Sequence, residues 1–511
     1  MMEGRVHKSM VNAEVNLLFY FLSLFFTFFS RKIFLNNLGA EFMGLTGTLN
    51  NILGYLNLSE LGISACIGYF LFKPLQTGNR QEIQQILSLL GWLYNRIGAI
   101  IFAGAFVVSL FFPLIFDHTA LGLGIIYFAF YSFLGSSLIG YFINYRQILL
   151  SADQKNYLVA IYYQSANLVK TGLQIFLAYY YKNLYIWVAV ELLFAVIGCV
   201  ILNWKINKEY PWLKVNKRDG RQLLKQYPEI ITKTKQVFIH KIKDFMLVRS
   251  DELFIFLFVS LKMVAYYGNY MIVFSKLISM FTAVISSVVA SVGNLVAEGN
   301  KPHMLKVFWE MTTIHHTIAA TLSFSLYLLI EPFISHWLGA EYIMDHNILV
   351  LLIIYIYITN SRNSVDSFNY AHGLYADVWS AWAELIINVS VTIVCGLQWG
   401  IIGILLGKIA SLVPIIVFWK PYYLFTAGFK EPVINYWKGV ARNYAISAFA
   451  IGASLYTVRF IPISPYHSIW DWALFAVISM VIFLTYDLTA TLLFAKGAKD
   501  SLNRIKILRK R

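Results

Sequence analysis

Long apolar segments alternate with short polar connections along the whole chain. Each segment is close to the roughly 20 residues that a helix needs to cross about 30 Å of hydrocarbon. About fourteen segments can be drawn, at residues 14–35, 44–72, 86–112, 123–145, 158–180, 184–203, 236–260, 264–295, 306–330, 346–370, 377–398, 401–420, 441–461 and 468–492. The pattern predicts an all-α, polytopic membrane protein with about 14 transmembrane helices.

The composition agrees with this prediction. Hydrophobic residues make up 59% of the 511 residues and charged residues 13%, whereas soluble domains carry about 25% charged residues. The first segment is too long for a signal-peptide core and no small-residue cleavage site follows, so we expect a retained span. Cys66, Cys199 and Cys395 lie far apart inside apolar segments, a spacing that suits neither disulfides nor metal ligands. No Walker-type phosphate loop occurs, and no metal or cofactor is predicted.

Basic residues are distributed asymmetrically between the connections. If the N-terminus is cytoplasmic, most Lys and Arg outside the spans fall in cytoplasmic connections, whereas the outer ones hold Lys182 and Lys262. This positive-inside distribution predicts that both termini are cytoplasmic. It explains most of the net charge of +15 without a nucleic acid partner. The tail RIKILRKR is expected to lie near anionic lipid headgroups.

The largest polar interruption, at residues 204–235, follows six spans and precedes six more. We therefore predict a lobe of six helices at 1–203, a basic cytoplasmic linker at 204–235, a second six-helix lobe at 236–420, and two additional helices with a basic tail at 421–511.

A weak internal repeat supports two lobes. Gly78-Asn79-Arg80 aligns with Gly299-Asn300-Lys301 at an offset of 221 residues, and the same offset pairs Asn167 with Asn388. An offset of six spans preserves orientation, so the lobes would be parallel repeats. Transporters bind substrate at such repeat interfaces, near the membrane midplane.

Several basic residues lie inside the predicted spans, where each costs about 2.5–3.5 kcal/mol at a helix centre. Lys32, Lys408 and Arg459 are near predicted outer ends, so we expect their side chains to extend to the membrane surface. Four others are too deep for this and are expected to face a lumen, with structural pairing as the alternative. These are Arg96, Lys170, Arg249 and Lys276.

Deep cations gathered around one cavity would attract a polyanion. Arg binds phosphate oxygens with a bidentate fork and Lys as a point charge, so such a cavity suits a phosphate or diphosphate headgroup. Arg362 and Asp366 are four residues apart on one helix face and could instead neutralise each other. The candidate substrate-binding residues are Arg31, Arg96, Lys170, Arg249, Lys276 and Arg362.

Acidic residues inside the spans form a second group of candidates. Glu60, in GYLNLSELGIS, has no basic residue nearby in the sequence. It is either a buried partner of a cation on another span or a group whose protonation changes as the lobe moves. The candidate coupling or cavity-lining residues are Glu60, Asp251, Asp366, Glu384 and Asn388. His315 and His316 have no carboxylate at a metal-binding spacing.

Stretches spread from about residue 15 to 425 resemble the polysaccharide flippases of the Wzx type, and their order and spacing agree with that family. They are RKIFLNNLGAEFMGLTGTLNNILGYLNLSELGI, YFLFKPLQTGN, YRQILLSADQKNY, FIHKIKDFMLVRSDELFI, YYGNYMIV, SSVVASVGNLVAEGN, HWLGAEYI and AWAELIINVSVTIVCGLQWGIIGILLGKIAS.

The resemblance implies the multidrug/oligosaccharidyl-lipid/polysaccharide exporter fold, with two six-helix lobes in a V around a central cavity. The implied activity is transfer of an undecaprenyl-diphosphate-linked oligosaccharide between leaflets of the bacterial inner membrane, for surface polysaccharide biosynthesis. A polysaccharide polymerase and a chain-length regulator would be possible partners. Arg31 best matches a cavity arginine of related lipid flippases, whereas the many lysines within the spans depart from some relatives.

Two other functions compete with a flippase. An ion-coupled multidrug exporter of the same superfamily would prefer an acidic cavity for cationic drugs, and the deep cations count against it. A membrane-embedded polymerase or glycosyltransferase would place its chemistry on a sizeable outer loop. The longest predicted outer loop, residues 331–345, pairs no base with a nucleophile. The chain is therefore not expected to be an enzyme.

Overall fold

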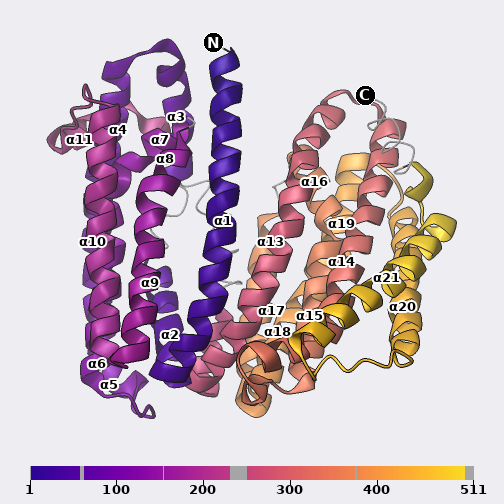
Figure 1. Ribbon diagram of the computed structural model, residues 1–511. Helices are drawn as coiled ribbons and strands as arrows, with labels where there is room; N and C mark the ends of the chain where they lie inside the picture. The colour runs from indigo at the N-terminus through magenta and orange to yellow at the C-terminus, as the bar shows by residue number, and fades with distance from the viewer. Residues whose placement is uncertain (1, 58–62, 154, 231–249, 375–376, 501–511) are drawn as a thin grey trace. The chain divides into compact units, whose positions relative to one another are not determined.

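The computed structural model describes residues 2–57, 63–153, 155–230, 250–374 and 377–500. These residues form helices joined by short connections, and no strand occurs among them (Figure 1). Nine of their helices are long and apolar enough to cross a membrane. Wherever its residues are described, each predicted apolar segment coincides with helix. The prediction of an all-α, polytopic membrane protein is confirmed.

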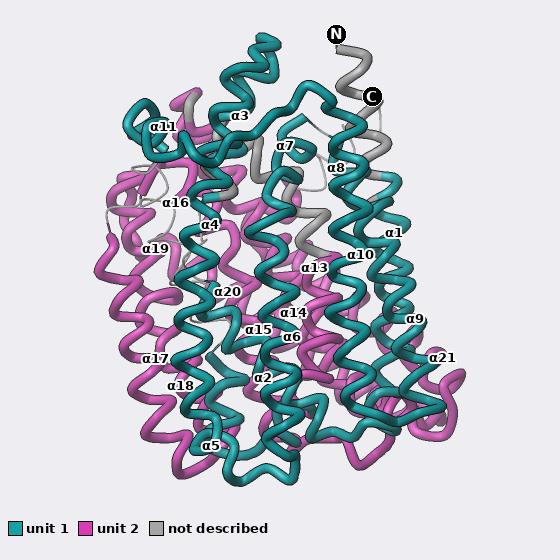
Figure 2. Tube along the Cα trace, turned by 90° about the vertical axis from the view of Figure 1, so that its left-hand side faces the viewer, with its two compact units in different colours: residues 1–265 teal, residues 266–511 magenta. Residues whose placement is uncertain are grey.

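The chain divides into two compact units, residues 1–265 and 266–511, which Figure 2 distinguishes by colour. The sequence places the start of the second lobe at residue 236. Residues 250–258 are helical and belong to the first unit. The division into six, six and two spans remains a prediction.

Unit 1 consists of long helices interrupted by short ones. Helix α6 packs against α2, α4 and α10, while α9 packs against α1 and α10. The long helices are α1 (Met2–Leu38), α2 (Ala40–Leu56), α3 (Ile63–Thr77), α4 (Arg80–Leu110), α6 (Leu123–Phe142), α9 (Ser165–Tyr180) and α10 (Leu184–Glu209). The short elements are α5 (Phe112–Ile115), η2 (Asn144–Arg146), α7 (Gln147–Ala152), α8 (Asn156–Val159), the π-helix η3 (Ala160–Gln164), η4 (Lys217–Asp219) and α11 (Gly220–Gln226).

The second predicted span, 44–72, differs from the structure because α2 and α3 are separate helices. Helix α2 ends at Leu56, and the Asn57 side chain after it donates a 3.1 Å hydrogen bond to Ser137 on α6. At its start, Gly39 has φ +90°, a left-handed conformation that favours glycine and separates α1 from α2.

Unit 2 is built around α14 (Lys301–Trp337), which packs against α15, α16, α20 and α21. Its other elements are α13 (Leu261–Ala297, which begins in unit 1), η5 (Ala340–Tyr342), α15 (His346–Ser361), α16 (Asn363–Ala371), α17 (Val378–Trp399), α18 (Ile401–Leu412), the π-helix η6 (Val413–Trp419), α19 (Lys420–Tyr423), the π-helix η7 (Leu424–Phe429), α20 (Ile434–Val458) and α21 (Ile469–Phe494).

The helix that starts at Ile401 is longer than predicted. The expected span ended at residue 420, but π-helical turns carry it past Pro414 and Pro421 to Phe429. Wider turns relieve the missing N–H and the ring clash of proline inside a helix. Lys430, with φ +53°, then ends the helix in the left-handed conformation.

Helix α17 shows how unit 2 orders its polar and apolar side chains. Its buried residues recur every four positions and are all polar or small: Ser380, Glu384, Asn388, Thr392 and Gly396. Its exposed large side chains are apolar: Val378, Trp379, Trp382, Ile386, Ile393, Val394, Leu397 and Trp399. Apolar surface outside and polar groups inside is the arrangement that a lipid environment selects.

Candidate functional site

Lys170 lies on α9 and forms an ion pair across the contact of α9 with α10. Its Nζ is 2.6 Å from Oε1 of Glu191, and Oε2 of Glu191 accepts a 3.1 Å hydrogen bond from Gln174. The Lys170 and Glu191 side chains are 15% and 25% exposed. The structural pairing that the sequence left open as an alternative to a lumen is therefore present.

Arg96 is more exposed than Arg31 and Lys170, the other described candidates for substrate binding in unit 1. It lies on α4 with an exposed side chain, and its guanidinium carbon is 4.1 Å from the ring centroid of Trp92, one turn earlier. Such a contact at an exposed site contributes about 0.5–1 kcal/mol. Trp92 in turn packs on Gly220 of α11, where any Cβ would collide with the indole. The indole is thus fixed beneath the guanidinium.

Arg31 is held by the backbone. Its Nη2 donates a 3.0 Å hydrogen bond to the carbonyl oxygen of Ala265. This contact joins α1 to the last residue of unit 1. Arg249 and Glu60, two other candidates, lie outside the described residues.

A buried polar contact links α2 to helical residues 250–258. Asn51 donates a 2.5 Å hydrogen bond to Oε2 of Glu252, and the neighbouring Asp251 is 3% exposed. The two segments approach closely because Gly44 of α2 contacts the carbonyl oxygen of Leu261. Asn51 was not predicted as a site residue, although an asparagine in the middle of an apolar segment is a usable signal.

In unit 2, Arg362 and Asp366 form the pair that their four-residue spacing predicts. The Nη1 of Arg362 is 2.9 Å from Oδ1 of Asp366, and the side chains are 23% and 41% exposed. Arg362 separates α15 from α16. Within the described residues its Nε is buried without a hydrogen-bond partner, so the guanidinium is only partly satisfied.

The remaining candidates of unit 2 lie inside it or at its edge. Glu384 and Asn388 are 3% and 2% exposed on the polar face of α17, and Lys276 on α13 is half-buried. The expectation that Lys408 reaches the membrane surface is wrong. Its side chain is 5% exposed, with Nζ 4.6 Å from the ring centroid of Tyr355. Helix α18 packs on both α15 and α17, so a position near a helix end does not reveal which face it occupies.

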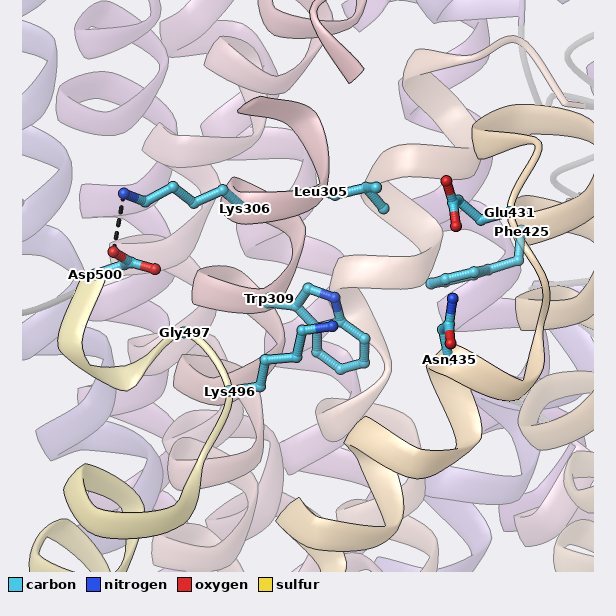
Figure 3. A pocket seen from close by; sticks show the side chains of 9 residues that line it. All are labelled: Leu305, Lys306, Trp309, Phe425, Glu431, Asn435, Lys496, Gly497 and Asp500. Atoms are coloured by element: carbon cyan, nitrogen blue, oxygen red, sulfur yellow. Dashed lines mark ion pairs between the residues drawn. The ribbon is translucent and has the colours of Figure 1, made fainter. Parts of the chain in front are cut away.

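Unit 2 also contains a cavity of about 290 Å³ between α14, α20 and the residues that follow α21 (Figure 3). Trp309 and Lys496 stack at its centre, with Nζ 4.3 Å from the indole centroid. Burial, with the nearby charge of Arg442, lowers the pKa of Lys496. The lining residues are Leu305, Lys306, Trp309, Phe425, Glu431, Asn435, Lys496, Gly497 and Asp500.

Ion pairs balance the charges of this cavity. Lys306 is 2.9 Å from Asp500, and Lys301 is 2.8 Å from Glu431. The hydrogen bond with Lys301 lowers the pKa of Glu431 despite some desolvation. Trp309 also packs against Gly439. These contacts fasten the end of α21 to α14 and α20, so the cavity serves anchoring better than anion binding.

The described contacts therefore give the predicted cations different immediate partners. Lys170 and Arg362 are bound to acids, Arg31 is bound to a carbonyl oxygen, and Arg96 lies on an indole. Among the residues that the structure describes, no carboxylate pairs with Arg96, whose printed contact is the one with the indole. Arg96, exposed and rigidly supported, is the side chain best placed to bind an added anion.

No model of a known protein family matches the sequence, and a search of curated proteins finds no match. The fold does have solved counterparts. The chain is similar to the lipid II flippase MurJ in an inward closed conformation, with a TM-score of 0.65 and 14% identity, over 94% of this chain and 98% of that one. It is also similar to an inward-facing multidrug resistance MATE family transporter of the MOP superfamily. There the TM-score is 0.58 at 14% identity, over 83% of this chain and 99% of that one.

These similarities identify the class of fold. The chain has the polytopic helical fold of these two solved transporters.

Proposed function

We propose that this protein is a flippase that moves undecaprenyl-diphosphate-linked oligosaccharide repeat units from the cytoplasmic to the outer leaflet of the bacterial inner membrane. The product would serve surface polysaccharide biosynthesis. Two lobes would open alternately to the two sides, with the headgroup in a cationic cavity and the polyprenyl chain left in lipid.

One observation carries this proposal: the match to a lipid flippase extends over more of the chain than the match to a drug exporter. The match to the flippase covers 94% of the residues of this chain, and the match to the exporter covers 83%. The match to the exporter leaves the remaining 17% of this chain without a counterpart. The resemblance of the sequence to Wzx-type flippases points in the same direction.

The charges of the candidate residues support an anionic headgroup. Arg96 offers an exposed guanidinium, and an arginine binds a phosphate through two parallel hydrogen bonds. In the proposal, Arg31, Lys170, Arg249, Lys276 and Arg362 assist it, and Glu60, Asp251, Asp366, Glu384 and Asn388 line the cavity or couple its movement to an ion. Lys170 and Arg362 would have to exchange their present carboxylate partners for phosphate oxygens.

The second candidate function is an ion-coupled multidrug exporter, which the TM-score of 0.58 to a MATE family transporter favours. A cationic drug would need an unneutralised acid in the cavity. Among the described acids, Glu191 and Asp366 are bound by cations, which weakens this alternative. An ethidium efflux assay in a strain without its main drug pumps separates the two functions.

Reconstitution of the purified protein in liposomes tests the flippase. The probe is the lipid-linked repeat unit extracted from a strain that lacks this gene, loaded into the inner leaflet and detected with a membrane-impermeant glycosidase outside. We expect wild-type protein to expose the probe and Arg96→Gln to slow this by about tenfold, because one charge-assisted hydrogen bond is lost.

The matched control is Lys225→Gln, which neutralises an exposed cation of α11 and should leave the rate unchanged. In cells, the Arg96 variant should accumulate lipid-linked units on the cytoplasmic leaflet. Full export by a variant in which Arg31, Arg96, Lys170, Lys276 and Arg362 are all neutral would contradict the cationic cavity.

A further inference from the structure

Unit 1 contains a cavity of about 550 Å³, and none of the predicted site residues that the structure describes lines it. It lies where the ends of α2 and α6 and the middle of α4 meet the short elements η2, α7, α8 and η3. In Figure 1 this is the end of unit 1 that carries the labels α7 and α8. The lining residues are Asn57, Tyr94, Ser137, Gly140, Tyr141, Tyr145, Gln147, Ile148, Ser151, Asn156, Val159 and Gln164.

The chemistry of this lining is uniform. Every one of its polar side chains is an amide, a hydroxyl or a phenol, and none carries a formal charge. The ammonium of Lys217 lies 4.7 Å from the ring centroid of Tyr145 and donates hydrogen bonds to Asn95 and to the carbonyl oxygen of Phe142. Arg146 donates hydrogen bonds of 2.8 and 2.6 Å to Asn207 and Asn203 on α10. Lys155 is bound to Asp153 and Glu209. Among the described residues, the side chains that line the cavity are therefore polar and carry no formal charge of their own.

The aromatic wall is fixed by packing. The rings of Tyr94 and Tyr141 meet edge to face with centroids 5.3 Å apart, and both are 4% exposed. Tyr145 is wedged against Gly91, where a Cβ would lie 3.1 Å from its hydroxyl oxygen. Rigid aromatic rings give a ligand a preformed apolar face, with phenol hydroxyls at its edge.

The opposite wall is open and able to form hydrogen bonds. Ser151, Asn156 and Gln164 are exposed and Gln147 is half-buried. Ser151 donates a 3.1 Å hydrogen bond to Asn156, and this bond holds the two side chains in place relative to each other. Gln164 ends the π-helix η3, an irregularity of helices that often marks functional sites.

We propose that this cavity binds the uncharged sugar of the lipid-linked substrate, an inference that rests on the proposed flippase function. A pyranose presents C–H faces and hydroxyl groups that both donate and accept hydrogen bonds. Amide side chains also do both, and tyrosine rings cover the C–H faces. A diphosphate would require cations and a cationic drug would require an acid, and the lining residues that the structure describes include neither. The volume lies within the range of about 300–1,000 Å³ of small-molecule sites.

The position also suits the start of transport. Residues 146–156 lie in a connection that the charge distribution assigns to the cytoplasmic side. A sugar lipid synthesised on that side would meet this cavity first. Sugar recognition would then occur at this cavity of unit 1, and the diphosphate would be bound by a different set of residues, the proposed cations.

Binding measurements in lipid nanodiscs with the full-length protein test the inference. The two probes are undecaprenyl diphosphate and the lipid-linked repeat unit from the gene-deleted strain, compared by native mass spectrometry. We expect wild-type protein to prefer the sugar-bearing probe. Gln147→Met with Asn156→Leu should lower that preference by about tenfold, because two hydrogen bonds are lost, while binding of bare undecaprenyl diphosphate stays unchanged.

The matched control is Gln81→Met, an exposed glutamine on α4 outside the cavity, which should keep the preference. Ser151→Ala, a smaller change at the rim, provides a second variant should the double substitution fail to fold. An unchanged sugar preference in the folded cavity variants overturns the inference, and so does an equal loss of binding for both probes. If wild-type protein neither binds nor translocates either probe, the proposed function itself fails.

Discussion

Helices α9 and α10 of unit 1, and helices α17 and α18 of unit 2, are the fifth and sixth spans of the two predicted lobes. Each pair packs together tightly, but by different means. An ion pair between Lys170 and Glu191 connects α9 to α10. Glycines bring α17 and α18 together: Gly403 contacts the carbonyl oxygen of Cys395, and Gly407 contacts Thr392. Small residues spaced by four let helix backbones approach closely in membranes.

Each helix pair nevertheless has an ion pair at the same end, but the positions of the acid and the base are exchanged between the two units. In unit 1, Lys155 before α8 is 2.9 Å from Glu209 at the end of α10. In unit 2, Asp377 before α17 is 2.7 Å from Lys420, which follows α18 and η6. The offset of 221 residues carries Lys155 to position 376, next to Asp377, but carries Glu209 to position 430, ten beyond Lys420. The weak repeat therefore matches the first residue of each pair only, and with the opposite charge.

The difference between the two helix pairs indicates which of their charged side chains can reach a ligand. The Lys170–Glu191 pair is 15% and 25% exposed, whereas Lys408 and Glu384 on α18 and α17 are 5% and 3% exposed. A buried cation stays with its protein partners, because leaving them costs several kcal/mol. Any direct role of the fifth and sixth spans in binding an anion therefore falls to unit 1.

The largest effect is expected from the glycine contact of α17 with α18. In Gly407→Ala, the added Cβ would lie 2.6 Å from the backbone nitrogen of Thr392, and backbone cannot rotate away. The helices must separate, which should cost about 3 kcal/mol of folding stability. Thermal unfolding of the purified protein in detergent measures this.

Gly452→Ala is the control for that substitution. Gly452 also lies within a helix, α20, but a Cβ there meets nothing within 4 Å. It should be neutral or stabilising by up to about 1 kcal/mol, since alanine favours helix. Equal melting temperatures for the two variants would show that close packing is not what holds α17 to α18.

An intermediate effect is expected at the ion pair that closes α17 and α18. Asp377 accepts hydrogen bonds from Lys420, Trp419 and Ser380 at 2.7, 2.9 and 3.0 Å. Asp377→Asn should cost about 2 kcal/mol, because bonds to a charged acceptor are replaced by weaker ones. Asp377→Glu at the same site, which keeps the charge, serves as the comparison.

This pair also makes a prediction about pH. Burial raises the pKa of Asp377, but the hydrogen bond and charge of Lys420 outweigh it, so the pKa lies below the ordinary 3.8. The ionised carboxylate therefore stabilises the fold above pH 3.8, and this contribution is lost as the pH falls through the lower folded pKa. The difference in melting temperature between wild type and Asp377→Asn should shrink below about pH 4. A constant difference down to pH 2 would argue against the ion pair.

The sequence was sufficient to predict the helices, but not which face of each helix is buried. Apolar segments of membrane length predicted the long helices of the described residues, because hydropathy and length are properties of local sequence. The break of 44–72 into α2 and α3, and the run of helix past Pro414 and Pro421 to Phe429, were missed. The first depends on tertiary contacts such as the hydrogen bond of Asn57 to Ser137, and the second depends on π-helical turns around the two prolines.

The candidate site was predictable as a set of residue types and not as a set of contacts. The spacing of Arg362 and Asp366 predicted their pair, because both lie on one helix face. Glu191 as the partner of Lys170, and the burial of Lys408, depend on which helices become neighbours. The neutral cavity in unit 1 was missed entirely, since asparagine, glutamine and tyrosine in short helices give no signal in hydropathy or charge.

The smallest effect, and the one that bears most directly on function, is expected at Lys170 and Glu191. Each of Lys170→Gln and Glu191→Gln should cost about 1 kcal/mol of stability, and the double variant should cost little more, since a partly exposed pair couples weakly. Lys205→Gln on α10, whose pair with Glu209 spans 3.6 Å, is the control and should cost less than about 0.5 kcal/mol. Binding of undecaprenyl diphosphate then separates the two roles of Lys170. If Lys170 can turn to a phosphate, Glu191→Gln should tighten binding by freeing the ammonium, and Lys170→Gln should weaken it. If neither variant changes the affinity while both lower the melting temperature, the pair does nothing beyond holding α9 to α10.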